Sequence, residues 1–180
     1  MARVLNIGFG PLNLEKIVLA DSYKGTWIGI NISKEAVKNA KNIFANYKFY
    51  NKSIINCNIG KNKYDIVLAL EVLEHISFKN IFSVLDKIYK SLSNNGYFII
   101  SIPLNEGLDK LVLNGNNPNA HMRVYTKELI KFELTISKFI IIKTISLSAF
   151  HKFYNIKNFI SKIFPEKFIK NNLIILAQKI

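Results

Sequence analysis

The chain has 180 residues, 49% of them hydrophobic, and a formal net charge of +13 at pH 7. This length suits one hydrophobic core, so we predict a single domain that spans residues 1–180. The apolar runs are much shorter than the ~20 residues that a membrane-spanning helix needs, which excludes an integral helical membrane protein. The amino terminus lacks a signal-peptide pattern and the lone Cys57 cannot form an internal disulfide, so we expect a cytoplasmic protein.

The positive charge comes almost entirely from lysine, because Arg3 and Arg123 are the only arginines. Both halves of the chain carry a similar excess, so neither half forms a basic arm. Abundant Lys, Asn and Ile together are typical of coding in an AT-rich genome, and the excess therefore fits solvated faces of the protein. Charge does not exclude a nucleic-acid partner, but it does not favour one.

The first part of the chain alternates strand and helix patterns. Residues 3–8 form an apolar run that ends in glycine and precedes a helical pattern, which predicts a strand, a tight loop and a helix. Thr26–Ile32 is β-branched and aromatic enough for a second strand. Ser33 offers a hydroxyl to cap a second helix, whose apolar positions recur with helical spacing up to Tyr47.

The middle of the chain continues this alternation. Lys48–Ile54 predicts a short third strand, and Tyr64–Leu70 predicts a strongly apolar fourth strand. The apolar residues between 78 and 92 share one face of a helix, which Asn94–Gly96 stops because Asn and Gly tolerate the left-handed conformation. Tyr97–Ile102 is the next predicted strand.

The last part of the chain is less regular. Asn105–Asn119 is rich in Gly, Asn and Pro and predicts a mobile loop, after which Thr126 can cap a short helix. Phe139–Leu147 and Asn172–Ala177 have strand patterns. Phe150–Lys170, between them, holds many aromatic residues and lysines. It predicts either a surface helix that contacts a membrane or a lipid-linked acceptor, or a helix that faces the core.

The order of these elements predicts the fold class. Strands that alternate with amphipathic helices indicate a mainly parallel sheet that is covered on both faces. We therefore predict a doubly wound α/β fold with a seven-stranded sheet, which the last two strands close as an antiparallel edge. Such sheets bind ligands in the crevice at the carboxyl ends of their strands.

The first strand ends in Asn-Ile-Gly-Phe-Gly at residues 6–10. Glycines in this position let a ligand approach the backbone, and the free N–H groups of the next helix can bind a carboxylate or phosphate. Asn31, at the end of the second strand, takes the position that faces the ribose of an adenosine ligand. Ordinary turns contain the same residues, so their spacing alone leaves both interpretations open.

Four segments carry a family resemblance: Val-Leu-Asn-Ile-Gly-Phe-Gly from Val4, Trp-Ile-Gly-Ile-Asn-Ile-Ser from Trp27, Lys-Tyr-Asp-Ile-Val-Leu-Ala-Leu-Glu-Val-Leu-Glu-His-Ile from Lys63, and Leu-Ser-Asn-Asn-Gly-Tyr-Phe-Ile-Ile-Ser-Ile-Pro from Leu92. Their order resembles the class I S-adenosylmethionine-dependent methyltransferases over nearly the whole chain. Within that class it resembles most the ubiquinone-biosynthesis O-methyltransferases. The resemblance implies a Rossmann-like fold and S-adenosylmethionine as the cofactor.

The resemblance also implies a set of cofactor contacts at the strand ends. These are Asn6; Gly8, Phe9 and Gly10 at the methionine moiety; Asn31 and Ile32 at ribose and adenine; Ser53 and Ile54 at the adenine edge; and Leu70 beside the sulfonium. Members of the family usually carry an acid at the positions of Asn6 and Asn31, and often at that of Ser53. The predicted cofactor pocket is therefore more neutral than is usual.

The acidic turn after the fourth strand holds the candidates for catalysis. Transfer to a hydroxyl requires a base that removes its proton, and His75 is the candidate; the alternative is a structural histidine that bonds a loop carbonyl. Glu71, Glu74 and His75 would share one face of a helical turn. With His121 they resemble the divalent-metal site of the small-RNA 3′-terminal 2′-O-methyltransferases, which would suit Mg or Mn. The same turn also occurs in branches that need no metal.

Three functions remain open at this point. The first is O-methylation of a small-molecule, lipid-linked or sugar hydroxyl. The second is RNA 2′-O-methylation with the Glu/His metal site, against which the scarcity of arginine counts. The third is a catalytically inactive methyltransferase-like scaffold subunit, which the neutral cofactor pocket favours. The sequence does not indicate an oligomeric state.

Overall fold

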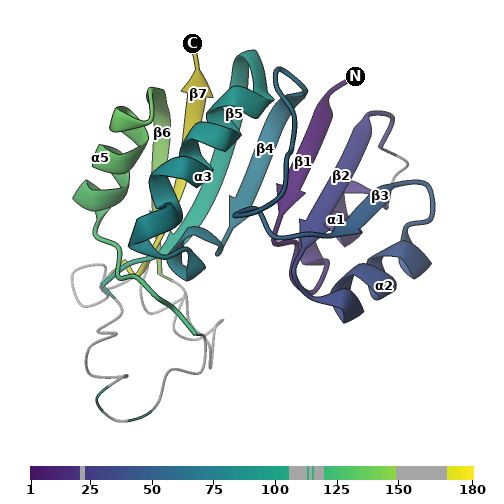
Figure 1. Ribbon diagram of the computed structural model, residues 1–180, viewed down its shortest axis with the longest axis horizontal. Helices are drawn as coiled ribbons and strands as arrows, with labels where there is room; N and C mark the ends of the chain where they lie inside the picture. The colour runs from purple at the N-terminus through teal and green to yellow at the C-terminus, as the bar shows by residue number, and fades with distance from the viewer. Residues whose placement is uncertain (21–22, 106–112, 114, 116–119, 149–169) are drawn as a thin grey trace, which may run out of the picture.

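A computed structural model describes residues 1–20, 23–105, 113, 115, 120–148 and 170–180. Within them lies a seven-stranded sheet of order β3-β2-β1-β4-β5-β7-β6 (Figure 1). Its strands are β1 (Arg3–Ile7), β2 (Thr26–Asn31), β3 (Lys48–Asn51), β4 (Tyr64–Leu70), β5 (Leu92–Pro103), β6 (Phe139–Leu147) and β7 (Asn172–Lys179). Neighbouring strands from β3 to β5 are parallel, whereas β7 is antiparallel to both β5 and β6. The predicted α/β fold with an antiparallel edge is therefore confirmed.

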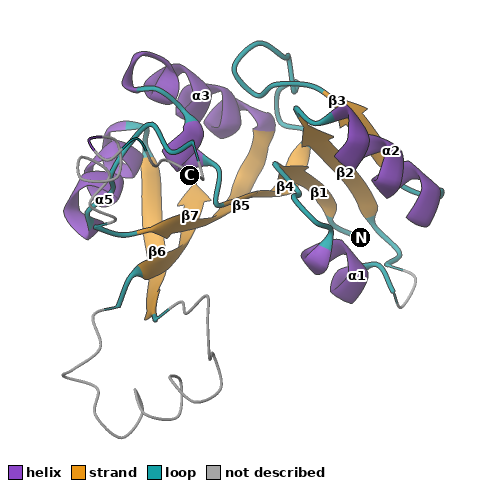
Figure 2. Ribbon diagram, turned by 90° about the horizontal axis from the view of Figure 1, so that it is seen from below, coloured by secondary structure: helices purple, strands orange, loops and turns teal. Residues whose placement is uncertain are grey.

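Helices cover both faces of this sheet (Figure 2). They are α1 (Asn13–Val18), α2 (Lys34–Ile43), α3 (Phe78–Ser91) and α5 (Lys127–Ile136), with a one-turn 3₁₀ helix, η1 (Leu73–His75). On one face, α3 and α5 bury residues such as Ile81 and Ile130 in the larger core cluster. On the other face, Val37 of α2 packs with Leu12 and Leu19, which flank α1.

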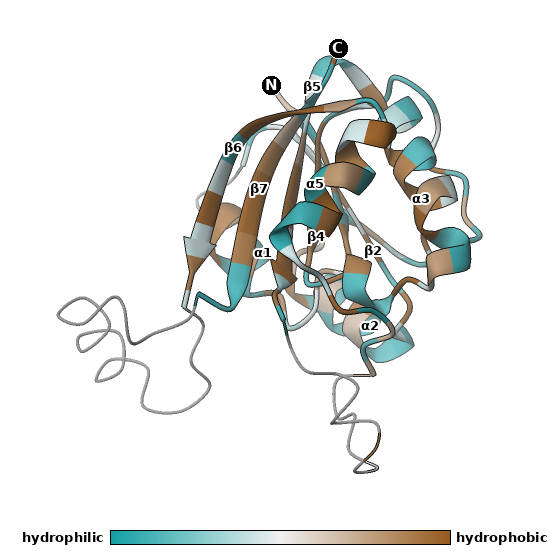
Figure 3. Cartoon of the chain, turned by 90° about the vertical axis from the view of Figure 1, so that its left-hand side faces the viewer, coloured by the Kyte–Doolittle hydropathy of each residue, from teal (hydrophilic) through white to brown (hydrophobic). Residues whose placement is uncertain are grey.

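The burial of each strand agrees with its place in the sheet. In β7, the buried residues Leu173, Ile175 and Ala177 alternate with half-buried ones, because, among the helices that the structure describes, α3 and α5 pack on one side of that strand. β1 is buried from Val4 to Ile7 because Val4 packs in the core cluster of α1 and α2, and Leu5 and Ile7 pack in the larger cluster on the opposite face. Figure 3 shows the apolar bands along β6 and β7. None of the helices in the described part of the chain has both the length and the apolar character needed to cross a lipid bilayer.

Both predicted helix caps are present. The Ser33 hydroxyl accepts a hydrogen bond from the N–H of Ala36 at 3.1 Å, and the Thr126 hydroxyl accepts one from the N–H of Leu129 at 3.1 Å. Each bond satisfies one of the N–H groups that the first turn of a helix leaves without a partner. The beginnings of α2 and α5 are thus determined locally.

Two predicted helix ends are different in the structure. α2 ends before Tyr47 because Phe44 leaves the helical region, with φ −123° and ψ 63°. α3 passes directly into β5, so the predicted stop at Asn94–Gly96 lies inside that strand. There Asn95 has a φ of 61°, and the pairing of β4 with β5 shifts its register. The left-handed residue was placed correctly, but it forms an irregularity of a strand rather than a helix end.

Two further predicted segments lie mostly outside the described residues. They are the loop over Asn105–Asn119 and the aromatic segment Phe150–Lys170.

The connection between β3 and β4 contains no helix. β3 is shorter than the predicted Lys48–Ile54, because the Asn51 amide donates to the carbonyl oxygens of Asn31 and Ile32 and turns the chain across the end of β2. Residues 52–63 then cross one face of β1 and β2 as bends and turns (Figure 1). This crossing forms part of the walls of two pockets.

Candidate cofactor pocket and catalytic turn

A pocket of about 440 Å³ lies at the carboxyl ends of β1, β2 and β4, next to the connection that follows β3. It is lined by Ile7, Gly8, Ile30, Asn31, Ile32, Lys52, Ser53, Ile54, Ile55, Glu71, Val72, His75, Ile76 and Ala120. Its volume falls within the range of about 300–1,000 Å³ that is typical of small-molecule sites. The position is the crevice where open α/β sheets bind ligands.

Gly8 lets the loop after β1 come close to Val72, which lies in the loop after β4. Its φ of +71° is left-handed, and a Cβ built on it would lie 2.6 Å from Cγ2 of Val72. Its N–H donates to the carbonyl oxygen of Ile30 at 2.8 Å, which fixes the loop against the end of β2. No side chain fits at Gly8, so its backbone is open to a ligand.

The structure brings part of the predicted cofactor set together. The predicted residues that line the pocket are Gly8, Asn31, Ile32, Ser53 and Ile54. Phe9 instead packs in the core beneath α2, with its ring centroid 5.2 Å from that of Phe49. Gly10 lines a separate hollow, and neither Asn6 nor Leu70 lines the pocket. The left-handed Gly8 redirects the chain, so Phe9 points into the core rather than toward the ligand.

At Asn31 the pocket offers less hydrogen-bond acceptor capacity than the sequence predicts. Asn31 was expected to accept hydrogen bonds from a ligand, but its Oδ1 already accepts the N–H of Ser33 at 2.8 Å. The amide nitrogen of Asn31 and the ammonium of Lys52, a pocket residue that sequence reasoning missed, are donors, and the bond to Ser33 uses one of the two lone pairs of Asn31 Oδ1. At the rim, Ile32 is 78% exposed and offers an apolar surface to a flat ring.

Asn6 belongs to a buried pair beneath the glycine loop. Its Nδ2 donates to Oε1 of Glu15 at 2.6 Å, and the Glu15 side chain is fully buried. A carboxyl from α1 thus lies against Asn6, the residue that stands where family members usually carry an acid. Sequence reasoning missed Glu15, although its spacing from the buried residues Leu12 and Leu19 places all three on one helical face.

The turn after β4 brings three of the four predicted metal ligands together. One ligand atom from each of Glu74, His75 and His121 lies within 4.8 Å of the other two. Glu74 is fully buried, His75 is exposed, and the His121 side chain is 10% exposed. The N–H of Met122 donates to the carbonyl oxygen of Glu74 at 2.9 Å and ties the two segments to each other.

Glu71 does not join this group, which corrects the predicted helical turn. It has a φ of +54°, and the 3₁₀ turn begins only after it, so Glu71 does not share a face with Glu74 and His75. Its Oε1 accepts hydrogen bonds from the Ser101 hydroxyl at 2.6 Å and from the Asn172 amide at 3.0 Å. Glu71 is therefore a wall of the pocket, held by β5 and β7.

The segment that carries His121 is anchored by a buried charged cluster. The Arg123 guanidinium donates to the Glu133 carboxylate of α5 and to the Tyr125 hydroxyl. All three side chains are buried, and burial raises the pKa of Tyr125 above its usual range. The one signal of this cluster in the sequence is Arg123 itself, because the chain contains only two arginines.

Replacing Glu15 with Gln tests the buried pair. Burial raises the pKa of Glu15 above its ordinary value of 4.5, although the Asn6 hydrogen bond partly offsets this. The folded state therefore favours the protonated acid, and the associated stability is complete below the ordinary pKa and lost as pH rises. We expect Glu15→Gln to raise the free energy of unfolding at pH 8 and to give a smaller gain at pH 4, measured by urea denaturation.

The exposed Glu35→Gln is the matched control and should show no gain that grows with pH. An equal effect of Glu15→Gln at pH 4 and pH 8 would contradict the prediction.

Comparison with known proteins shows the family and the fold of the chain. A family model described as a methyltransferase domain matches residues 3–158. A SAM-dependent methyltransferase from Archaeoglobus fulgidus has a TM-score of 0.74 at 18% identity, covering 99% of this chain and 86% of that one. The N-methyltransferase NodS from Bradyrhizobium japonicum WM9 has a TM-score of 0.71 at 11% identity, covering 99% and 85%.

A Haloferax volcanii methyltransferase in complex with the Trm112 methyltransferase activator has a TM-score of 0.75 at 12% identity, covering 98% of this chain and 82% of that one. No curated protein matches the sequence. These structures share the fold, and the family model covers most of the chain. The chain therefore belongs to the methyltransferase-domain family and has the class I fold of the S-adenosylmethionine-dependent methyltransferases.

Proposed function

We propose that the protein methylates a hydroxyl group, with S-adenosylmethionine bound in the pocket at the carboxyl ends of β1, β2 and β4. The observation that carries this proposal is that the predicted cofactor residues Gly8, Asn31 and Ile54 line the same pocket as His75. Cofactor contacts and a candidate base thus meet in one cavity. When bound, the cofactor supplies a methyl group on a positively charged sulfur.

The pocket walls offer groups that suit such a ligand. The Glu71 carboxylate gives a negative wall for the cationic end of the cofactor. Ile32 and Ile54 present apolar surface for the adenine ring. Gly8 leaves its backbone open to the amino-acid end.

His75 is proposed as the base. Its ring lines the pocket and is exposed, so an acceptor can reach it. Nδ1 lies 3.4 Å from the carbonyl oxygen of Ala120, a contact that orients the ring and leaves Nε2 to accept the hydroxyl proton. Holding acceptor and methyl in line is the other contribution that such an enzyme makes.

The finer assignments are part of this proposal. The acceptor is a small-molecule, lipid-linked or sugar hydroxyl, and the specific relation to the ubiquinone-biosynthesis branch rests on the sequence motifs. A single domain over residues 1–180 and a cytoplasmic location stay predictions from the sequence.

The role of His75 is tested by His75→Gln, which keeps polarity but removes the base. We expect methyl transfer from labelled S-adenosylmethionine, assayed against a panel of quinols and sugars, to slow by ~10²-fold or more, the usual contribution of a general base. Cofactor affinity, measured by calorimetry, should change little. Lys79→Gln, an exposed change at the start of α3, is the control, and equal rates for His75→Gln and the unaltered protein would refute the role.

The neutral ribose end gives a second prediction. Asn31→Asp keeps an acceptor for the Ser33 N–H and adds a charged acceptor for the ribose hydroxyls, and charge-assisted hydrogen bonds are the stronger kind. We expect S-adenosylhomocysteine to bind about tenfold more tightly, measured by calorimetry. Asn42→Asp adds the same charge on α2 outside the pocket and should leave affinity unchanged. If neither variant binds, the chain is the inactive scaffold rather than an enzyme.

One observation favours a second candidate, RNA 2′-O-methylation with a metal. The carboxylate of Glu74 and the imidazoles of His75 and His121 are close enough to hold one divalent ion, and two nitrogen ligands favour Mn over Mg. On this hypothesis the metal would bind the acceptor hydroxyls. Mn should then raise the melting temperature, and His121→Gln should abolish that shift; no shift with Mn would exclude this candidate.

A further inference from the structure

A second pocket lies beside the cofactor pocket, beneath the crossing of residues 52–63. It has a volume of about 380 Å³, and on β1 and β2 it is lined by the half-buried Ile28, with the buried Leu5 and Ile30 beside it. It shares only Ile30 and Lys52 with the cofactor pocket. This hollow lies where the connection crosses the sheet as bends and turns without a helix.

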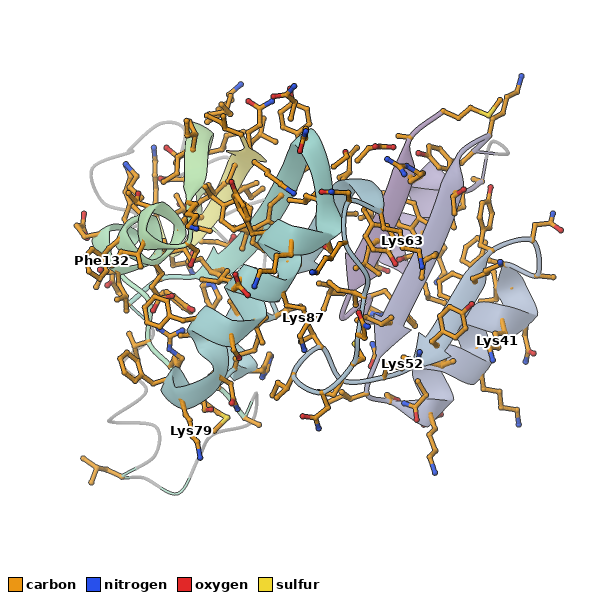
Figure 4. All side chains as sticks on the ribbon, turned by 45° about the horizontal axis from the view of Figure 1, so that its top comes forward. Lys41, Lys52, Lys63, Lys79, Lys87 and Phe132 are labelled. Carbon is orange, nitrogen blue, oxygen red and sulfur yellow. The ribbon has the colours of Figure 1, made fainter. Side chains whose placement is uncertain are left out.

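The rim of this second pocket is positively charged. The Lys52 ammonium lies 5.3 Å from the ring centroid of Tyr50, and the Lys63 ammonium lies 5.9 Å from that of Tyr64. Figure 4 labels both lysines, which stand at the two ends of the crossing. Within the described part of the chain, neither ammonium forms an ion pair, and no acidic side chain lines the pocket. Both positive charges are therefore available to a ligand.

We infer that this second pocket binds a small organic anion, with a flat apolar body against Ile28 and Tyr50 and a phosphate or carboxylate held by Lys52 and Lys63. The half-buried Ile28 and the exposed ring of Tyr50 suit the body, and the two ammonium groups compensate the charge. His75 and Glu71 do not line this pocket, so its ligand is distinct from the methyl acceptor. The inference goes beyond the proposed methyl transfer and does not depend on it.

The chain contains its own reporter for this pocket. Cys57, the only cysteine in the sequence, lines the pocket and is half-buried. Burial raises the pKa of its thiol, while the nearby Lys87 and Lys52 partly offset that effect. A bound ligand should therefore slow the alkylation of Cys57 by neutral iodoacetamide, which mass spectrometry of the intact chain can follow.

The experiment measures this protection with phenyl phosphate, benzoate, benzyl alcohol and inorganic phosphate, each titrated to millimolar concentration. We expect saturable protection by phenyl phosphate or benzoate, and the stronger of the two identifies the anion. Benzyl alcohol, which lacks the charge, and inorganic phosphate, which lacks the apolar body, should protect much less. Equal protection by either of these probes would overturn the inference, as would the absence of saturable protection.

A pair of lysine variants locates the site. Lys63 lines only the second pocket, so Lys63→Met should weaken protection about tenfold, the effect of one lost charged contact, while calorimetric binding of S-adenosylhomocysteine stays unchanged. Lys41→Met, on the outer side of α2 (Figure 4), removes the same charge elsewhere and should retain full protection. Protection of Lys63→Met equal to that of the unaltered chain would place the ligand elsewhere. Failure of the cofactor to bind would refute only the proposed methyl transfer.

Discussion

The close contact between Gly8 and Val72 is the constraint on which the candidate site depends. Two loops, one after β1 and one after β4, approach until a single Cβ at Gly8 would lie 2.6 Å from a Val72 methyl carbon. The hydrogen bond from Gly8 N–H to Ile30 adds β2 to the same arrangement. Three strand ends are thus fixed around one left-handed glycine. The pocket is the space that remains between these strand ends, and the backbone at Gly8 forms part of its wall.

Polar contacts connect distant parts of the chain to this edge. Glu71 closes β4 with a left-handed turn, and its carboxylate accepts hydrogen bonds from Ser101 of β5 and Asn172 of β7. β7, the last strand along the chain and antiparallel to β5, therefore supports a wall of the candidate cofactor pocket. The tie between Met122 and Glu74 brings a further segment to the same turn. Parallel strand ends and one antiparallel neighbour together define the site.

Local patterns were sufficient for the element order because they depend on neighbours in sequence. The capping hydroxyls of Ser33 and Thr126 act within one helical turn, and both were predicted correctly. Predictions that assumed a regular helix or strand were wrong where one residue with a positive φ interrupts the element. Glu71 was expected on a helical face with His75, and Phe9 was expected beside the ligand. In each case a positive φ, at Glu71 itself or at Gly8, turned the side chain elsewhere.

The sequence by itself determined the fold class, the positions of most strands and helices, and the strand ends at which Gly8 and Asn31 line one pocket. Periodicity and caps encode these features locally, and the antiparallel edge followed from two strand patterns without a regular crossover. Only the tertiary structure decided that Glu15 pairs with Asn6, that Glu71 turns away from Glu74 and His75, and that Lys52 lines two pockets. Those arrangements involve residues on different elements, and their geometry depends on how the elements pack, which no spacing along the chain records.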